Sequence, residues 1–86
     1  MFYGFNNNMY YSIWDNYWRV NRINSEAAIQ IALQRVPDRV VKVELDYENG
    51  RLVYEVDIRN QSGLYEVHVD AITGRILKVE REDNWD

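Results

Sequence analysis

The chain has 86 residues, of which 47% are hydrophobic and 28% charged, and this indicates one small globular domain rather than a disordered segment. It contains no cysteine, which excludes disulfides and thiolate metal sites. The net charge of −4 disfavours a nucleic-acid partner, because such a protein needs a basic face to neutralise phosphates. Acidic residues outnumber basic ones by 13 to 8 in residues 25–86, so we expect a partner of this part to be basic or apolar.

The start of the chain is aromatic: residues 1–24 hold 8 of its 12 aromatic residues. We call residues 1–22 the aromatic extension. Tyr10, Trp14 and Tyr17 have helical spacing, and Trp18 lies next to them, so these four side chains are the predicted contact with a partner or a second copy. Four interpretations stay open: packing on the chain's own core, a homodimer contact, binding of another protein, or contact with a membrane interface. The membrane is disfavoured because only Arg19 and Arg22 add positive charge.

No targeting segment is recognisable in this sequence. The start lacks basic residues followed by an apolar run, as a secretory signal would have, and no stretch approaches the ~20 apolar residues of a spanning helix. Taken alone, these observations predict a cytoplasmic chain.

A single helix is predicted from Ser25 to Val36. The Ser25 hydroxyl is available to cap the first turn, and Pro37 cannot continue the helix. Its apolar side chains follow helical spacing and form one stripe, which consists of Ala28, Ile29, Ala32, Leu33 and Val36. We expect this stripe to cover one face of a sheet.

Four strand segments follow between Val40 and Arg81, joined by three tight turns. Asn49-Gly50 favours a two-residue type I′ hairpin turn. Counting outward from this turn gives four apolar pairs on one face: Tyr47 with Leu52, Leu45 with Tyr54, Val43 with Val56, and Val41 with Ile58. The next two turns continue the same face, with these pairs: Ile58 with Tyr65, Val56 with Val67, Tyr54 with Val69, Val69 with Leu77, and Val67 with Val79.

All three hairpins therefore place their apolar residues on the same inward face, and a shift of the pairing by one residue would destroy these matches. The sequence predicts an α+β fold in which one helix packs on a four-stranded antiparallel meander sheet, with an aromatic-rich N-terminal extension. Residues 1–22 form the extension and residues 23–86 the domain.

The opposite face of this sheet is predicted to be polar. It gathers seven carboxylates, which are Glu44, Asp46, Glu55, Asp57, Glu66, Asp70 and Glu80. These could hold a calcium ion, attract a basic partner, or only keep the face soluble. Val53, Leu64 and Ile76 interrupt this face.

His68, the single histidine, is expected on the same face as a solvent-exposed residue between Glu55 and Lys78. A general base would need a nucleophile or a metal ion beside it, and the predicted neighbours are only carboxylates and an amine. We find no phosphate-binding loop, no serine–histidine–aspartate set and no metal-ligand spacing. The sequence therefore predicts no catalytic residue, no cofactor and no metal site.

The order of these segments resembles the PepSY domain family. The resemblance covers residues 23–81 and is most specific at Val69-Asp70-Ala71-x-Thr73-Gly74-Arg75-Ile76-Leu77, where the aspartate and the Thr-Gly turn have the family spacing. It implies a helix laid across an antiparallel sheet, no catalysis of its own, a role in restraining peptidases and an extracytoplasmic setting. The compartment therefore stays undecided between the two indications.

Taken together, the residues and the resemblance predict a non-enzymatic PepSY-like module that binds a protein, with inhibition of a peptidase as the finer hypothesis. The alternative is a self-associating structural protein, such as a dimer or a bacterial coat component, that assembles through the aromatic extension.

Overall fold

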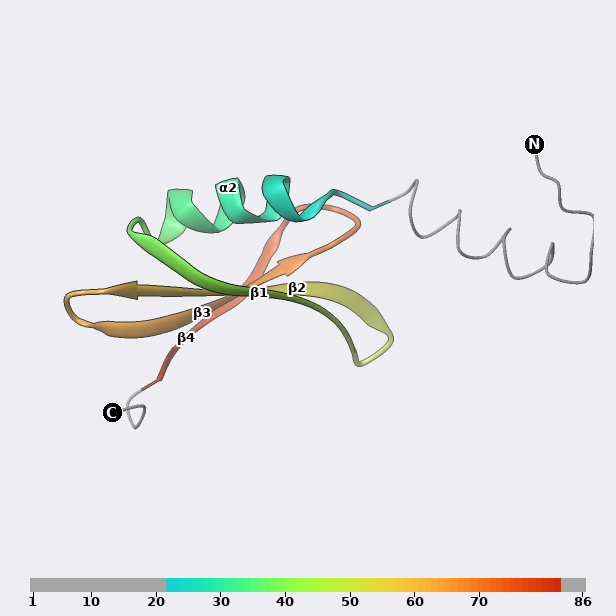
Figure 1. Cartoon of the computed structure of the whole chain (residues 1–86). Helices are drawn as coiled ribbons and strands as arrows, with labels where there is room; N and C mark the ends of the chain where they lie inside the picture. Colours follow the sequence, from blue (N-terminus) through green and yellow to red (C-terminus); the bar gives the residue numbers. More distant parts are fainter. Residues whose placement is uncertain (1–21, 83–86) are drawn as a thin grey trace, which may run out of the picture.

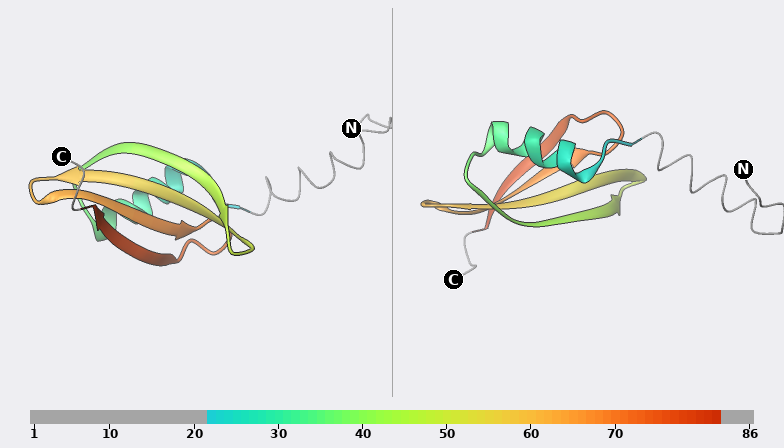
Figure 2. Two further views of the ribbon diagram at one scale, coloured as in Figure 1. Left: turned by 90° about the horizontal axis from the view of Figure 1, so that it is seen from below. Right: turned by 45° about the horizontal axis from the view of Figure 1, so that its top comes forward.

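The computed structural model describes residues 22–82. It contains one helix and four strands: α2 (Ser25–Arg35), β1 (Arg39–Glu48), β2 (Arg51–Asn60), β3 (Gly63–Asp70) and β4 (Ile76–Glu82). The strands form one antiparallel sheet in the order β1-β2-β3-β4, and α2 lies across one of its faces (Figure 1; Figure 2). This confirms the predicted fold class. Residues 1–21 of the aromatic extension, with Tyr10, Trp14, Tyr17 and Trp18, lie outside the described residues.

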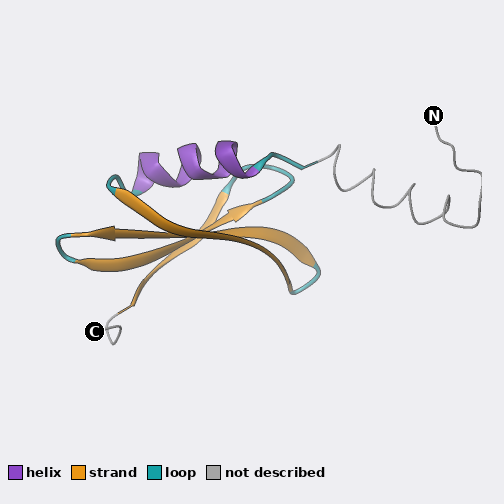
Figure 3. Ribbon diagram, viewed as in Figure 1, coloured by secondary structure: helices purple, strands orange, loops and turns teal. Residues whose placement is uncertain are grey.

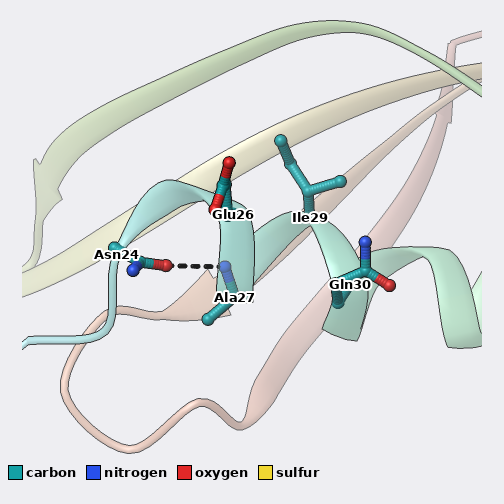
Figure 4. A pocket seen from close by; sticks show the side chains of 5 residues that line it. All are labelled: Asn24, Glu26, Ala27, Ile29 and Gln30. Carbon is teal, nitrogen blue, oxygen red and sulfur yellow. Dashed lines mark hydrogen bonds between the residues drawn. The ribbon is translucent and has the colours of Figure 1, made fainter.

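The helix begins at a different cap from the predicted one. Asn24 is the N-cap, and its side-chain oxygen accepts a hydrogen bond of 2.8 Å from the backbone N–H of Ala27 (Figure 4). Ser25 is the first residue of the helix, so its predicted capping role is wrong by one position. At the other end Val36 has extended backbone angles, as expected for a residue that precedes a proline.

The helix packs on the sheet through its smallest side chains. Ala28 and Ala32 are completely buried, whereas Ile29 and Leu33 are half-buried along the sides of the contact. Because alanine has a short side chain, the helix can approach the sheet closely without leaving a void. The core consists of Ala28, Ala32, Val36, Tyr54, Val56, Ile58, Val67, Val69 and Ala71.

Most of the predicted strand register is confirmed. Asn49 and Gly50 have φ values of 52° and 75°, as a type I′ turn requires. The predicted β1–β2 pairs of Tyr47 with Leu52, Leu45 with Tyr54 and Val43 with Val56 are confirmed, and only the pair at Val41 differs. The three predicted β2–β3 pairs, which end with Tyr54 opposite Val69, are all confirmed. The agreement follows from the turns, since a two-residue loop leaves the flanking residues one choice of partner.

Two β-bulges correct the remaining pairs. Val40 lies opposite Ile58, so the predicted pair of Val41 with Ile58 is wrong, and Val41 is 49% exposed. Val69 lies opposite Ile76, so its predicted pair with Leu77 is also wrong. In both places one extra residue enters the edge strand and changes which residue faces the helix. Ile76 consequently packs against the core instead of lying on the opposite face.

The chain enters α2 beside the loop that joins β3 to β4. The backbone N–H of Ile23 donates to the carbonyl of Ala71 at 2.8 Å, and the Tyr54 hydroxyl donates to the carbonyl of Ile23 at 2.9 Å. Ala71 in turn donates to the carbonyl of Leu52 at 2.9 Å. These bonds anchor the start of the described chain near the beginning of β2, where the aromatic extension would join it.

The sheet is twisted, and the tip of the β1–β2 hairpin bends away from α2 (Figure 3). The face opposite the helix is therefore partly enclosed at this end. In residues 22–82 no helix has the length and apolar character needed to cross a membrane.

Candidate functional site

The face opposite α2 brings five ionisable side chains from all four strands together. We call them the histidine cluster, which consists of Glu48, Glu55, Glu66, His68 and Glu80. The side-chain ligand atoms of Glu48, Glu55 and His68 lie within 4.8 Å of one another, and so do those of Glu66, His68 and Glu80. His68 is common to both sets and therefore lies at the centre of the cluster.

His68 is only 5% exposed, so the predicted solvent-exposed side chain is wrong. Its cross-strand neighbours are Glu55 and Lys78 as predicted, but the bent hairpin also brings Glu48 close, with Oε1 3.5 Å from Nδ1. Nε2 lies 3.8 Å from Oε2 of Glu66, is buried, and has no hydrogen-bond partner among residues 22–82. A buried polar atom without a partner costs ~1–3 kcal/mol, so this nitrogen needs an explanation.

Two carboxylates of the cluster, Glu48 and Glu55, are joined by a hydrogen bond. Hydrogen bonding to Glu48, burial and the nearby Glu66 together raise the pKa of Glu55 to about 8. The pKa of Glu48 is lowered, chiefly because its carboxylate accepts the hydrogen bond from Glu55. Glu55 therefore keeps its proton at neutral pH and donates it to Glu48.

Like charges also face one another across the strands. Glu44 opposite Glu55 and Asp57 opposite Glu66 are confirmed, and Glu66 also lies opposite Glu80. Burial, followed by the charge of Glu66, raises the pKa of Asp57. Such pairs destabilise the sheet unless a cation or a proton lies between them. At the edge Lys78 pairs with Glu80 at 3.2 Å, which raises the pKa of Lys78.

A shallow hollow adjoins the cluster under the bent hairpin. It is lined by Glu48, Arg51, Val53, His68, Leu77 and Lys78. Val53 is 1% exposed, although the sequence placed it as an exposed interruption of a polar face. The bend of the hairpin and the bulge at Leu77 explain the difference, because both bring side chains toward Val53.

Asp70 does not belong to the cluster. Its Oδ1 accepts the backbone N–H groups of Ile72 and Thr73 at 2.8 and 2.9 Å, and its Oδ2 accepts from Arg51 at 3.1 Å. Burial alone would raise its pKa, but these hydrogen bonds and the Arg51 charge outweigh it, so the pKa is lowered. The run that carries the PepSY resemblance therefore builds the β3–β4 turn and is structural.

The other predicted acidic residues act separately from the cluster. Glu44 pairs with Lys42 at 3.4 Å, and Asp46 accepts the backbone N–H of Tyr47 at 2.8 Å. Of the seven carboxylates predicted for this face, the structure thus brings Glu55, Glu66 and Glu80 to His68. Glu48 was missed. Strand alternation places it on the correct face, but its contact with His68 depends on the bend of the hairpin.

The chemistry open to the histidine cluster is limited by its composition. Its members are carboxylates and an imidazole, which can hold protons or ligate a cation, and none is a nucleophilic hydroxyl or thiol. A general base needs a reacting group within hydrogen-bond reach. The cluster is therefore suited to cation binding.

A second surface lies along β1, which is an edge strand. Leu45 and Tyr47 are 39% and 58% exposed, although they lie on the face that carries the helix. The helix packs mainly over β2 and β3 and leaves this end of β1 uncovered (Figure 2). We call Leu45, Tyr47 and the open side of their strand the β1 edge.

A third feature is a shallow recess beside the helix start. It is lined by Asn24, Glu26, Ala27, Ile29 and Gln30 (Figure 4). The Asn24 oxygen is already occupied by the Ala27 N–H, and the polar side chains around it are exposed. This recess therefore offers no buried polar group to a ligand.

Two known proteins match this chain over most of its length. The uncharacterized protein YkoJ of Bacillus subtilis (strain 168) is 36% identical over 62 residues, which cover 71% of this chain and 36% of YkoJ. The crystal structure of a candidate lipoprotein (CD1622) from Clostridium difficile 630 matches with a TM-score of 0.70 and 29% identity, covering 72% of this chain and 41% of that one. This chain thus spans well under half the length of both relatives.

The match to a family model covers nearly all of the described residues. Residues 22–80 match PepSY, described as the peptidase propeptide and YPEB domain. The match includes α2, the first three strands and most of β4, and the solved relative has the same fold. The chain belongs to the PepSY family.

Proposed function

We propose that this chain is a non-catalytic PepSY module that binds an extended segment of a protein partner along the β1 edge and restrains a peptidase in this way. The observation that carries the proposal is the exposure of Leu45 and Tyr47 on a strand that pairs on one side only within residues 22–82. Extended peptides commonly add to such an edge, where main-chain hydrogen bonds give affinity and side-chain contacts give specificity.

The β1 edge is better suited to such pairing than β4, the other edge. In β4 the bulge at Leu77 and the charged side chains of Lys78 and Arg81 discourage pairing. In β1 the bulge and Lys42 lie at the beginning, which leaves Val43 to Tyr47 regular and free of lysine and arginine. Glu44 and Asp46 lie on the other face of this segment, so a partner segment with basic side chains fits best.

The family description supports a peptidase as the partner, since PepSY is named for peptidase propeptides. The test is the rate at which a thermolysin-like protease cleaves a peptide reporter with micromolar protein present. We expect wild type to slow cleavage and the double variant Leu45→Lys/Tyr47→Lys to lose the effect. Unchanged cleavage with wild type would count against the proposal.

A matched control is available on β4. Leu77 has the same exposed fraction as Leu45, 39%, and also lies on an edge strand. Leu77→Lys therefore matches the single change Leu45→Lys at the other edge and should leave inhibition intact. Equal loss in this variant and in the β1 variant would remove the assignment to β1.

The alternative function is self-association through the aromatic extension. It is favoured by the position of Ile23, whose backbone N–H donates to the carbonyl of Ala71. Ala71 in turn donates to Leu52, which lies opposite Tyr47. The extension therefore joins the domain close to an exposed apolar edge. Sedimentation velocity of the full chain and of a chain without residues 1–22 separates the possibilities. Assembly predicts that the truncated chain becomes monomeric and stays folded, whereas packing in cis predicts that Trp14→Ala costs ~3–5 kcal/mol.

The setting of the interaction is also a proposal. One solved relative is described as a candidate lipoprotein, which favours a place outside the cytoplasm. Fractionation of cells that produce the protein would test this. Recovery with cytoplasmic markers would contradict it.

A further inference from the structure

The starting observation is the unpartnered Nε2 of His68. The His68 side chain is 7% exposed, and Nε2 is buried without a hydrogen bond to any residue that the structure describes. The nearest carboxylate oxygen, on Glu66, is 3.8 Å away, which is too far for a hydrogen bond. Glu80 brings a third ligand atom, and the three atoms lie within 4.8 Å of one another.

We propose that Glu66, His68 and Glu80 bind a divalent transition-metal ion of the zinc type, with Nε2 as the nitrogen ligand. Glu66 and His68 are two residues apart on β3 and so share a face, and Glu80 lies directly opposite Glu66 on β4. Two ligands of a tetrahedral zinc ion with bonds of ~2.0–2.1 Å are ~3.3 Å apart. The 3.8 Å from Nε2 to Glu66 is close to this spacing, so small side-chain rotations would form the site.

The other side of the imidazole supports the same assignment. Oε1 of Glu48 lies 3.5 Å from Nδ1, on the opposite edge of the ring from Glu66. Metal-binding histidines usually donate their second ring N–H to a carboxylate, which fixes the tautomer and the ring orientation. Glu48 is placed for this role, as a positioning residue and not as a ligand.

The charge of the cluster also favours a cation. Glu66 lies directly opposite Glu80, and like charges in this position destabilise a sheet. A divalent ion bound between the two carboxylates would remove this repulsion.

The donor set selects the kind of metal. Calcium and magnesium prefer all-oxygen sites, whereas an imidazole with carboxylates suits zinc and its neighbours. Lys78 competes with the metal, because its ammonium group pairs with Glu80 at 3.2 Å. Removal of this lysine charge should therefore strengthen metal binding, which a nonspecific loss of structure would not do.

The experiment is calorimetric titration of the untagged full chain with zinc ions near neutral pH. We expect one saturable site, weakening of ~10-fold or more in Glu66→Gln and Glu80→Gln, and ~10-fold weakening in Glu48→Gln. Lys78→Met should bind more tightly. Glu44→Gln is the matched control, because it removes the same charge from the same face outside the cluster. Thermal unfolding of each variant checks that it folds, and Glu80, which is exposed, can be replaced with little risk to the fold.

Nuclear magnetic resonance identifies the ligand atom directly. His68 is the single histidine of the chain, so its ring signals need no further assignment. We expect zinc to shift Nε2 while Nδ1 keeps its proton. The proposal is overturned if zinc shows no saturable binding, if Glu44→Gln weakens binding as much as Glu66→Gln, if the metal is found on Nδ1, or if equimolar calcium displaces it.

Discussion

The two faces of the sheet are both partly buried, but they bury different chemistry. Under α2 the buried side chains are apolar, and the one polar group among them, the Tyr54 hydroxyl, donates to the Ile23 carbonyl. The opposite face buries His68 and Asp70, and only Asp70 has its polar atoms satisfied. The helix face therefore supplies stability. The opposite face leaves Nε2 of His68 without a hydrogen bond among the described residues.

The largest expected effect is on the helix face. Ile58 is completely buried in the core, so Ile58→Ala should lower the free energy of unfolding by ~2–5 kcal/mol. The matched control is Val41→Ala, since the sequence pairs Val41 with Ile58 and the structure exposes Val41 at the bulge. Chemical denaturation should show a change of ~0.5 kcal/mol or less for Val41→Ala. A large loss there would contradict the bulge.

The next effect tests the satisfied aspartate of the opposite face. Asp70→Ala leaves two backbone N–H groups and Arg51 without an acceptor, and should cost ~1–3 kcal/mol. Because the folded pKa of Asp70 is lowered, its ionised form stabilises the fold above the unfolded pKa, and this contribution is lost as the pH falls below about 4. Denaturation curves between pH 7 and pH 3 should therefore be less pH-dependent in Asp70→Ala. Parallel wild-type and variant curves would refute this.

A smaller effect concerns the helix that covers the core. Asn24→Ala removes the side-chain oxygen that caps Ala27 and should cost ~1 kcal/mol. Ser25→Ala should cost about 0.5 kcal/mol or less, because Ser25 is exposed and lies inside the first turn. Thermal unfolding of the two variants decides between the caps. A larger loss in Ser25→Ala would restore the cap expected from sequence.

The smallest effect is a pH dependence on the opposite face. The folded pKa of Glu55 is raised to about 8, so its contribution to stability is fully present below the unfolded value, 4.5, and is lost as the pH rises through 8. Glu55→Gln mimics the protonated carboxyl and should flatten the decline in melting temperature between pH 5 and 8. Glu44→Gln is the control and should keep the wild-type slope. Equal slopes in wild type and Glu55→Gln would show that Glu55 does not hold the proton.

The fold was predictable because local signals agreed. Asn49-Gly50 defined one hairpin, and alternation carried the same face through β2 and β3. The two errors in register both lie in edge strands, at Val41 and Leu77, where one side of the strand is unpaired and an extra residue can be accommodated. Alternation alone cannot reveal a bulge, because two adjacent apolar residues fit either phase.

The candidate site was less predictable. Alternation placed His68, Glu55 and Glu66 on one face correctly, but it treated that face as flat and open to water. The bend of the hairpin brings Glu48 to His68 and encloses Val53. Contacts of this kind join residues that are not cross-strand partners, so pair counting does not find them.

The sequence by itself determined the order of the strands, the hairpin turns and the side of the sheet that the helix covers, because turn residues and strand alternation act over a few neighbouring positions. Only the tertiary structure decided which valine meets Ile58, how deeply His68 is buried and which carboxylates surround it. The physical reason is that twist and bulges accumulate along whole strands, and their sum brings distant side chains together.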